Sequence, residues 1–491
     1  MADHVRTTPL RLRPNEHRTI LFSGDLLMAL ASVFLALYTW RQYNLYVFRI
    51  LFARYVAEGI KLGPARELAQ SQTIFEVPFW FYILPILWVL LLVELYEPHK
   101  SASVRKTIQG IAIAAFIGLI AYSLAFIIQQ ESNLPRIGVG AFLLYAAALT
   151  LTWRMLFIRA YKSTGQRRRM LVVGAGNAGQ TIAELYRKLD TGSFTIVGFV
   201  DDDQQKVGKE FFGIPVMCTS ANLLSIIDSQ RISDLVVAIN GEMHGTTFQT
   251  ILDAQEHGVD VTRMPLLYEE MTSRVPVLHL ESDWIIRSFV DQLHVSGFYE
   301  LAKRLLDIIG GLFGLLIFAL MFPFLGLAIW LDTGSPIFYT QDRLGKGGIR
   351  FKIYKFRSML QDADMEGAPF TTMENDPRVT RVGGFLRRTR LDELPQFWSV
   401  LRGEMSLVGP RAERPGLVAE YQKQIPFYRA RLLVKPGLTG WAQINYGYVS
   451  SVTETIVKLE YDLYYIRHRT LAMDVSIILR TIGTVLRRTG R

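Results

Sequence analysis

Long apolar segments constrain this chain more than any other feature of its sequence. Each is close to the ~20 residues that a helix needs to cross the hydrocarbon core of a bilayer, and tryptophan or tyrosine stands near several of their ends, as interfacial anchors do. We therefore predict a membrane protein with a cytoplasmic tail at residues 1–19 and a four-helix transmembrane bundle at residues 20–160. The four segments are Ile20–Trp40, Val77–Val93, Ile108–Ile128 and Val139–Ile158.

Positive charge lies mostly outside these segments. The net charge is +10 although 50% of the residues are hydrophobic. Arginines precede the first segment and follow the fourth, for example Arg18 and Arg169, so the positive-inside rule predicts that both ends of the bundle are cytoplasmic. The basic surface can meet anionic membrane lipid or a phosphorylated substrate. Apolar runs of this length argue against nucleic acid as the partner.

Cysteine and histidine usage excludes several other chemistries. Cys218 is the only cysteine, which excludes an intrachain disulfide and a cysteine-rich zinc site. The eight histidines form no HExxH pair or other metal-ligand spacing.

Short strands alternate with helices from Arg169 onward. Met170–Val173, Phe194–Val200, Asp234–Ile239 and Val259–Met264 have the composition of buried strands, and helical patterns stand between them. This alternation is typical of a doubly wound parallel sheet. We predict a Rossmann-like α/β domain over residues 166–285.

A glycine motif, GAGNAG, follows the first of these strands and opens a helix. Gly174, Gly176 and Gly179 would allow a tight turn and close approach of a phosphate to the helix N-terminus. Asp201, at the end of the second strand, would accept a hydrogen bond from a ribose hydroxyl. No Tyr-x-x-x-Lys pair or other hydride-transfer apparatus follows in this segment. Two interpretations stay open: a nucleotide site, or a module that keeps the turn without a cofactor.

Adjacent carboxylates, Asp392 and Glu393, lie in a strongly basic segment of the C-terminal third. Arginine suits phosphate because its planar fork binds two oxygens together. In such a field both carboxylates would be held as anions, able to attack phosphorus or to hold Mg²⁺ against a diphosphate. They could instead be salt-bridge partners on a solvated helix, but the neighbouring motifs favour catalysis. The candidate phosphate-binding cations are Lys355, Arg357, Arg387, Arg388 and Arg411.

The ordered motifs between Lys303 and Tyr465 resemble the bacterial sugar transferase family, the monotopic phosphoglycosyl transferases that begin surface polysaccharide synthesis. The four spans and the Rossmann-like module resemble the long form of that family, which primes exopolysaccharide or O-antigen synthesis. The motifs are Gly334–Tyr339, Gln341–Gly345, Phe351–Met359, Asp376–Thr380, Arg387–Gln396, Ser406–Arg411 and Lys435–Gln443.

This resemblance implies that a UDP-sugar and polyprenyl phosphate give polyprenyl-diphospho-sugar and UMP, with Mg²⁺ required. It implies that Asp392 attacks the sugar-linked phosphate and forms a covalent phosphosugar, and that Glu393 assists by binding metal or activating the polyprenyl phosphate. Lys355, Arg357 and Arg411 would bind phosphate or nucleotide. The family often has proline after the Gly-Pro-Arg turn, whereas this chain has Ala412, which puts nucleotide contacts there in doubt.

A fifth apolar run, Ile308–Leu331, is long enough to span the membrane. A crossing there would separate the Arg-rich domain from cytoplasmic nucleotide sugars, and Pro323 interrupts the run with a residue that can bend a helix. We predict a re-entrant membrane helix that opens a mostly α-helical catalytic domain at residues 295–491. Lys303 and Arg304 would then sit at headgroup level near the lipid phosphate.

The predicted location is the bacterial cytoplasmic membrane, with the catalytic domain on the cytoplasmic face and a homodimer as the expected assembly. Two other functions stay open. One is a membrane-bound, NAD-dependent nucleotide-sugar modifying enzyme that uses the glycine motif. The other is a non-catalytic assembly or regulatory scaffold.

Overall fold

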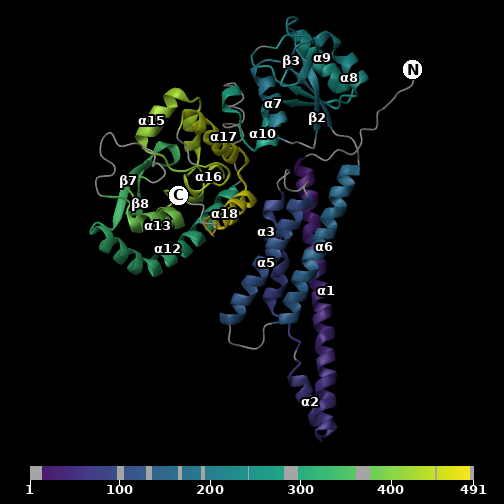
Figure 1. Ribbon diagram of the computed structural model, residues 1–491, viewed down its shortest axis with the longest axis vertical. Coiled ribbons are helices and arrows are strands. Elements are labelled where there is room, and N and C mark those ends of the chain that lie inside the picture. The colour runs from purple at the N-terminus through teal and green to yellow at the C-terminus, as the bar shows by residue number, and fades with distance from the viewer. Residues whose placement is uncertain are drawn as a thin grey trace. The chain divides into compact units, whose positions relative to one another are not determined.

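The computed structural model describes residues 14–73, 75–96, 104–128, 135–163, 168–189, 194–241, 243–280, 297–360, 376, 378–447 and 451–486. Residues 1–13 of the predicted N-terminal tail lie outside this range. The chain divides into two compact units, Met1–Arg167 and Arg168–Arg491, whose elements Figure 1 labels along the chain.

Helices are the only regular secondary structure among the described residues of the first unit. Its helices pack around one apolar core that includes Leu21, Trp88 and Phe142, and large apolar side chains such as Phe34 and Phe116 are exposed on the outside. An apolar exterior of this kind suits a lipid environment. The helices are α1 (Pro14–Ala57), α2 (Leu62–Ser71), η1 (Phe79–Ile83), α3 (Leu84–Leu91), η2 (Val93–Tyr96), α5 (Val104–Ile128) and α6 (Arg136–Ser163).

Three of the four predicted spans are long helices, but the second is not. The helical stretch Phe79–Leu91 is shorter than a spanning helix. Pro78 precedes η1 and Pro85 stands in the first turn of α3, and proline lacks the N–H group that a preceding helical turn would bind. Among the described residues, the helices long and apolar enough to cross a membrane are α1, α5, α6 and α12 (Gly297–Thr333).

A buried ion pair that the sequence did not single out lies inside this unit. Arg154 on α6 contacts Asp25 on α1 at 2.6 Å, and Tyr96 donates a hydrogen bond to the same carboxylate at 2.8 Å. Both members of the pair are almost completely buried. Ionisable residues within apolar helices are tolerated when they pair with one another, so this contact ties α1 to α6.

The second unit begins with the predicted Rossmann-like fold. Its six-stranded sheet has the order β3-β4-β2-β1-β5-β6, and β1 pairs in parallel with both β2 and β5. The prediction missed the β3–β4 pair. The elements are β1 (Arg168–Val173), α7 (Asn177–Lys188), β2 (Phe194–Val200), β3 (Glu210–Phe211), β4 (Ile214–Cys218), η3 (Ser220–Asn222), α8 (Leu223–Gln230), β5 (Asp234–Val237), α9 (Gly245–Glu256), β6 (Asp260–Arg263), α10 (Met264–Thr272) and η4 (Val277–His279).

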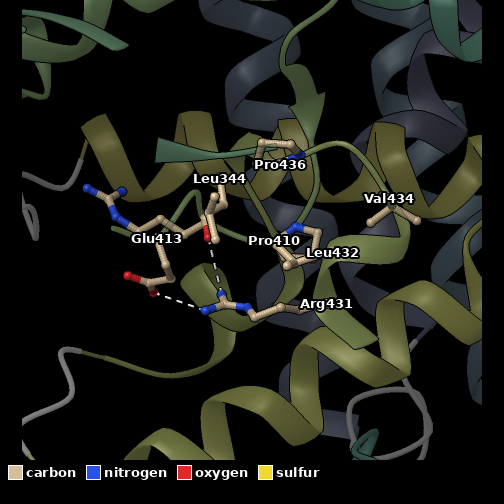
Figure 2. A pocket seen from close by; sticks show the side chains of 8 residues that line it. Leu344, Pro410, Glu413, Arg431, Leu432, Val434 and Pro436 are labelled. Carbon is tan, nitrogen blue, oxygen red and sulfur yellow. Dashed lines mark hydrogen bonds and ion pairs between the residues drawn. The ribbon is translucent and has the colours of Figure 1, made fainter. Parts of the chain in front are cut away.

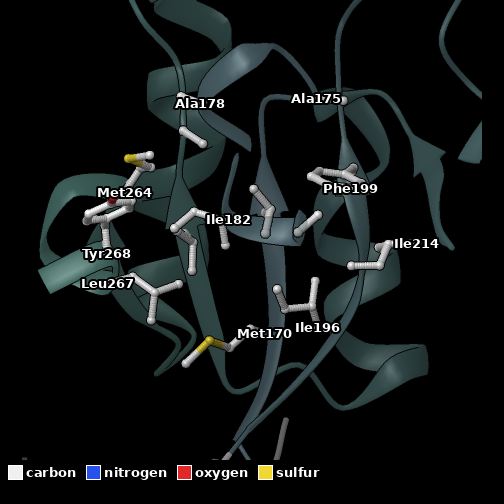
Figure 3. Packing of buried hydrophobic residues seen from close by; sticks show 14 of the residues in the cluster. Met170, Ala175, Ala178, Ile182, Ile196, Phe199, Ile214, Met264, Leu267 and Tyr268 are labelled. Carbon is white, nitrogen blue, oxygen red and sulfur yellow. The ribbon is translucent and has the colours of Figure 1, made fainter. Parts of the chain in front are cut away.

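One face of this sheet packs against helices α7 and α10. Met170 and Ile196 project from β1 and β2 towards Ile182 of α7 and Tyr268 of α10, and all four belong to one buried cluster (Figure 3). A second buried cluster, which includes Leu171, lies on the opposite face. Burial on both faces explains why the last four residues of β1, Met170–Val173, are apolar without alternation.

The remainder of the second unit is a small mixed domain whose strands form two separate pairs. Strands β7 and β8 are antiparallel, whereas β9 and β10 are parallel. Its elements after α12 are β7 (Phe338–Leu344), η6 (Lys346–Gly348), β8 (Arg350–Phe356), α13 (Arg381–Thr389), η7 (Leu391–Gln396), α14 (Phe397–Arg402), β9 (Ser406–Val408), α15 (Pro415–Gln424), η8 (Tyr428–Leu433), β10 (Gly437–Thr439), α16 (Trp441–Asn445), α17 (Val452–His468) and α18 (Leu471–Leu486).

Helix α12 contains the fifth apolar run and is anchored to this domain at both ends. Near its start, Asp307 accepts hydrogen bonds from Ser406 and from the Leu407 N–H at 2.9 and 2.8 Å. At its end, Asp332 accepts from the Val382 N–H at 3.2 Å. Pro323 lies inside the helix. Between the anchors, large apolar side chains are exposed: Ile309, Leu312, Phe313, Leu316, Leu320, Phe324, Leu327, Trp330 and Leu331.

Candidate active site

The carboxylates Asp392 and Glu393 lie in the short helix η7. Thr380 caps the preceding helix α13 by accepting from the Gly383 N–H at 2.9 Å. Gly383 lets α13 dock directly on the chain after β8, because a Cβ there would lie 2.0 Å from the Ser358 carbonyl oxygen. Arg390 then ends α13 in the left-handed region at φ 59°. This turn sends η7 back across β8.

Glu393 is held by cations from distant parts of the chain. Lys355 of β8 and Arg411 both donate to its Oε1 atom at 2.9 Å, and Arg390 lies 3.9 Å from Oε2. Asp392 has a looser environment: its Oδ2 atom is 3.9 Å from the Lys355 amine. Within the described residues, no hydrogen bond to the Asp392 carboxylate is present.

The two neighbouring carboxylates therefore ionise differently. Burial raises the pKa of Asp392, and the charge of Glu393 adds to this, while Lys355 opposes it. Burial also tends to raise the pKa of Glu393. The positive charges of Lys355, Arg411 and Arg390 outweigh this effect and hold that pKa well below its ordinary value. Glu393 is thus a permanent anion whose charge is neutralised by nearby cations. The carboxylate of Asp392 has fewer and more distant cations around it. Such divergent environments are characteristic of catalytic carboxylate pairs.

Two glycine motifs place Arg411 beside this pair. Strand β9 leads into Gly409-Pro410-Arg411, and β10 pairs with it in parallel. A Cβ at Gly409 would lie 2.4 Å from the Lys435 carbonyl oxygen, and one at Gly437 would lie 2.1 Å from the Gly409 nitrogen. Only glycine at both positions lets the two turns approach this closely. The Ser406–Arg411 and Lys435–Gln443 motifs are therefore two halves of one structural unit.

A second ion-pair network fixes the turn that carries Arg411, and the sequence analysis did not identify it. The buried Arg431 donates to Asp462 at 2.8 Å and to the Arg411 carbonyl oxygen at 3.2 Å, and Lys458 donates to Glu413 at 2.7 Å. Figure 2 shows Arg431 reaching both Glu413 and the turn. The pocket there holds only about 10 Å³, room for one water, so it is too small for a nucleotide. The sequence signal was the unusual set of charged residues on α17.

Other predicted phosphate-binding cations have protein partners in the structure. Lys303 donates to the Val408 carbonyl oxygen and to Asp474, both at 3.0 Å. Arg304 donates to the carbonyl oxygens of Val400 and Leu401 at 2.9 and 2.7 Å, which caps the C-terminus of α14. These contacts position α12, and a role for the two residues at the lipid phosphate stays a prediction.

Arg357 and the arginines of α13 lie in different surroundings. Arg357 is buried and donates to Thr333 at 2.6 Å and to the Gly334 carbonyl oxygen, which fixes the end of α12. Arg387 acts electrostatically on Asp392. Arg388 is exposed and donates to the Gly384 carbonyl oxygen at 3.1 Å. The structure thus brings Lys355, Arg387 and Arg411 to the carboxylates, while Arg357 and Arg388 contact the chain elsewhere.

Ala412, the departure from the family pattern, is buried against Phe351 and Val400. Its carbonyl oxygen accepts a hydrogen bond from Arg343 at 3.0 Å. Burial and the nearby charges of Arg411 and Arg414 lower the pKa of Arg343 to about 10. Arg343 also lies 4.0 Å from the carboxylate of Glu413, which Arg431 and Lys458 contact as well.

Two regions of the chain match known protein families. Residues 298–488 match the family described as "Bacterial sugar transferase", and residues 93–265 match "CoA-binding domain". The chain is 40% identical over 228 residues to the UDP-N-acetylgalactosamine-undecaprenyl-phosphate N-acetylgalactosaminephosphotransferase of Aeromonas hydrophila, across 46% of this chain and 52% of that relative. This alignment thus spans about half of the relative's length.

Two other relatives align over a larger share of their length. The UDP-galactose-lipid carrier transferase of Erwinia amylovora is 31% identical, across 66% of this chain and 69% of the relative. The UDP-glucose:undecaprenyl-phosphate glucose-1-phosphate transferase of Escherichia coli is 33% identical, across 65% and 68%. The chain belongs to the bacterial sugar transferase family.

Proposed function

We propose that this chain transfers a sugar 1-phosphate from a UDP-sugar to polyprenyl phosphate, giving polyprenyl-diphospho-sugar and UMP. The family membership supports the reaction type. The observation that carries the assignment of the site is the contrast between Asp392 and Glu393. One carboxylate is saturated by cations, and the other faces them across a longer gap.

In this mechanism an Asp392 carboxylate oxygen attacks the phosphorus that bears the sugar. The bond from that phosphorus to the UMP oxygen breaks, and UMP leaves with the electron pair. A phosphate oxygen of the lipid then attacks the same phosphorus and displaces the Asp392 carboxylate. Lys355 and Arg411 stand where charge develops on the phosphoryl oxygens, and such preorganised cations stabilise a phosphoryl-transfer transition state.

Magnesium is compatible with the residues at this site. Mg²⁺ is commonly held by one or two carboxylates together with substrate phosphate oxygens. Glu393 already binds cations on both oxygens, whereas Asp392 keeps its lone pairs available. Asp392 would therefore be the better ligand, and the ion would neutralise negative charge on the substrate diphosphate.

Asp392→Asn tests the site. We expect loss of UMP release from a UDP-sugar in the presence of polyprenyl phosphate and Mg²⁺, because the amide cannot act as the anionic nucleophile. Asp342→Asn is the matched control, since Asp342 is exposed on β7. Near-normal UMP release from Asp392→Asn would refute the assignment, as would a labelled phosphosugar that stays attached to that variant.

We also propose that α12 re-enters the membrane rather than crossing it. Asp307 and Asp332 both bind the same compact domain, although a straight helix of 1.5 Å rise per residue would separate them by nearly 40 Å. If α12 crossed the bilayer, parts of this one charged domain would have to lie on both sides of the membrane. The exposed apolar side chains of α12 would face lipid instead, with the domain on the cytoplasmic face of the inner membrane.

Cysteine labelling tests this topology. In a Cys218→Ala background, Glu300→Cys and Ser335→Cys place one thiol near the start of α12 and one just after its end, where both native side chains are exposed. We expect an impermeant maleimide to label both from the same side of oriented vesicles. Labelling of the two thiols from opposite sides would show that α12 spans the bilayer.

A further inference from the structure

A large cavity lies in the Rossmann-like module. It has a volume of about 540 Å³ and is lined by the ends of β1 and β2, the first turn of α7 and the loop after β5, a size typical of small-molecule sites. Strand β1 lies between β2 and β5 in the sheet, so the chain order reverses there. Ligands of doubly wound sheets bind at this switch point, beyond the carboxyl ends of the strands.

The three glycines of the motif differ in what requires them. Gly174 has φ +106°, a conformation that other residues rarely adopt. A Cβ at Gly179 would lie 2.0 Å from the Gly174 carbonyl oxygen, so close packing excludes a side chain. Gly176 has φ −82°, which any residue adopts, and a Cβ there would meet no atom within 4 Å. The fold therefore requires glycine at positions 174 and 179. It does not require glycine at position 176, where the missing side chain leaves space in the cavity beside the backbone.

The side of the cavity formed by α7 offers hydrogen-bond donors. Gly176 precedes the helix and provides no side-chain cap, so the first backbone N–H groups of α7 are not capped from that position. Helix N-termini of this kind favour phosphate oxygens. Gly176 would let a diphosphate approach them closely.

Another part of the cavity lining, which begins beside the glycine turn, is acidic. The Asp201 carboxylate accepts from the Ala175 N–H at 2.8 Å and from Lys206 at 3.0 Å, and Lys206 lies 3.9 Å from Asp203. Thr247 donates to Asp202 at 2.7 Å. The positive charge of Lys206 is thus already shared by Asp201 and Asp203, and Asp202 adds a third negative charge. This side suits hydroxyl donors and disfavours a further phosphate.

We propose that this cavity binds a nucleoside diphosphate ester whose ribose hydroxyls are free, separately from the transferase site. The diphosphate lies at the first turn of α7 beside Gly176. The ribose hydroxyls donate to the acidic side at Asp201 and Asp203. Both adenine dinucleotides and nucleotide sugars carry this chemistry, whereas coenzyme A and NADP⁺ carry a ribose phosphate that the carboxylates repel.

Binding to the full-length protein in detergent tests the proposal, with NAD⁺, a UDP-sugar, NADP⁺ and coenzyme A as separate probes for calorimetry. We expect NAD⁺ or the UDP-sugar to bind, and NADP⁺ and coenzyme A to bind at least about tenfold more weakly. Gly176→Val puts a branched side chain at a position where a Cβ meets no atom within 4 Å, and it should remove this binding, with Gly176→Ala intermediate. The UDP-sugar can bind at both sites. Gly176→Val should therefore abolish its binding in the cavity and leave its binding at the transferase site unchanged.

Gly416→Val is the matched control, because a Cβ at Gly416 in α15 also meets no atom within 4 Å. It should leave binding unchanged. UMP release retained by Gly176→Val shows that this variant is folded, and this readout is independent of the cavity. Absence of any binding that Gly176→Val removes would overturn the proposal. Binding of coenzyme A or NADP⁺ as tight as that of NAD⁺ would overturn the assignment of free ribose hydroxyls.

Discussion

Replacing Lys355 with methionine tests how the site keeps its nucleophile ionised. Lys355 lies beside both carboxylates, at 3.9 Å from Asp392 and 2.9 Å from Glu393. Methionine keeps an unbranched stem of similar length and removes the charge. Glu393 retains Arg411 and Arg390 in the variant, so it stays an anion and continues to oppose ionisation of Asp392.

The magnitude follows from the distance. With an effective dielectric constant of about 20, unit charges 3.9 Å apart interact with about 4 kcal/mol. Because burial already raises the pKa of Asp392 and Lys355 is the largest opposing influence, its removal raises that pKa further. The interaction corresponds to roughly three orders of magnitude in the ionisation equilibrium as an upper bound, since water can partly replace the lost charge.

The assay is the rate of UMP release as a function of pH. We expect Lys355→Met to be slowest relative to the native protein near pH 6, and to recover part of the difference near pH 9, where Asp392 ionises without help. The acidic limb of the profile should move to higher pH. Lys352→Met, an exposed lysine on the same strand, should leave the profile in place. An equal loss for Lys355→Met at every pH would refute this reasoning and assign Lys355 to substrate binding.

Two further predictions concern the contact between the Rossmann-like module and the transferase domain. Burial raises the pKa of Glu460 to about 7 despite Arg274, so folding stability should fall as pH rises between about 4.5 and 7, by ~3 kcal/mol. Glu460→Gln should remove this dependence, and its thermal midpoint should exceed that of the native protein by more at pH 8 than at pH 5; an equal difference would contradict the prediction. Glu269 on α10 binds both Arg467 and His468 of α17, so Glu269→Ala should lower hydrogen-exchange protection of α10 and the end of α17, with exposed Glu256→Ala as the control. Unchanged protection would show that this contact is dispensable.

Local patterns in the sequence determine much of the architecture. The apolar segments predict α1, α5, α6 and α12 because a helix in lipid satisfies its backbone groups internally. Alternation of strands and helices predicts the parallel sheet for a similarly local reason. The predicted span at Val77–Val93 was wrong, because hydropathy averages over a window of residues whereas Pro78 and Pro85 each interrupt the helix at one position.

The sequence also identified Asp392 and Glu393 and their basic surroundings, but only the tertiary structure distinguished the two carboxylates. Glu393 is paired with Lys355, 38 residues earlier, and with Arg411, 18 residues later, and no local pattern encodes these distances. The same holds for Lys303 and Arg304, whose protein acceptors lie between 96 and 171 residues away. Hydrophobic periodicity is a property of neighbours along the chain. The partner of a charged group depends on how distant segments pack, and that choice decides which carboxylate remains available for chemistry.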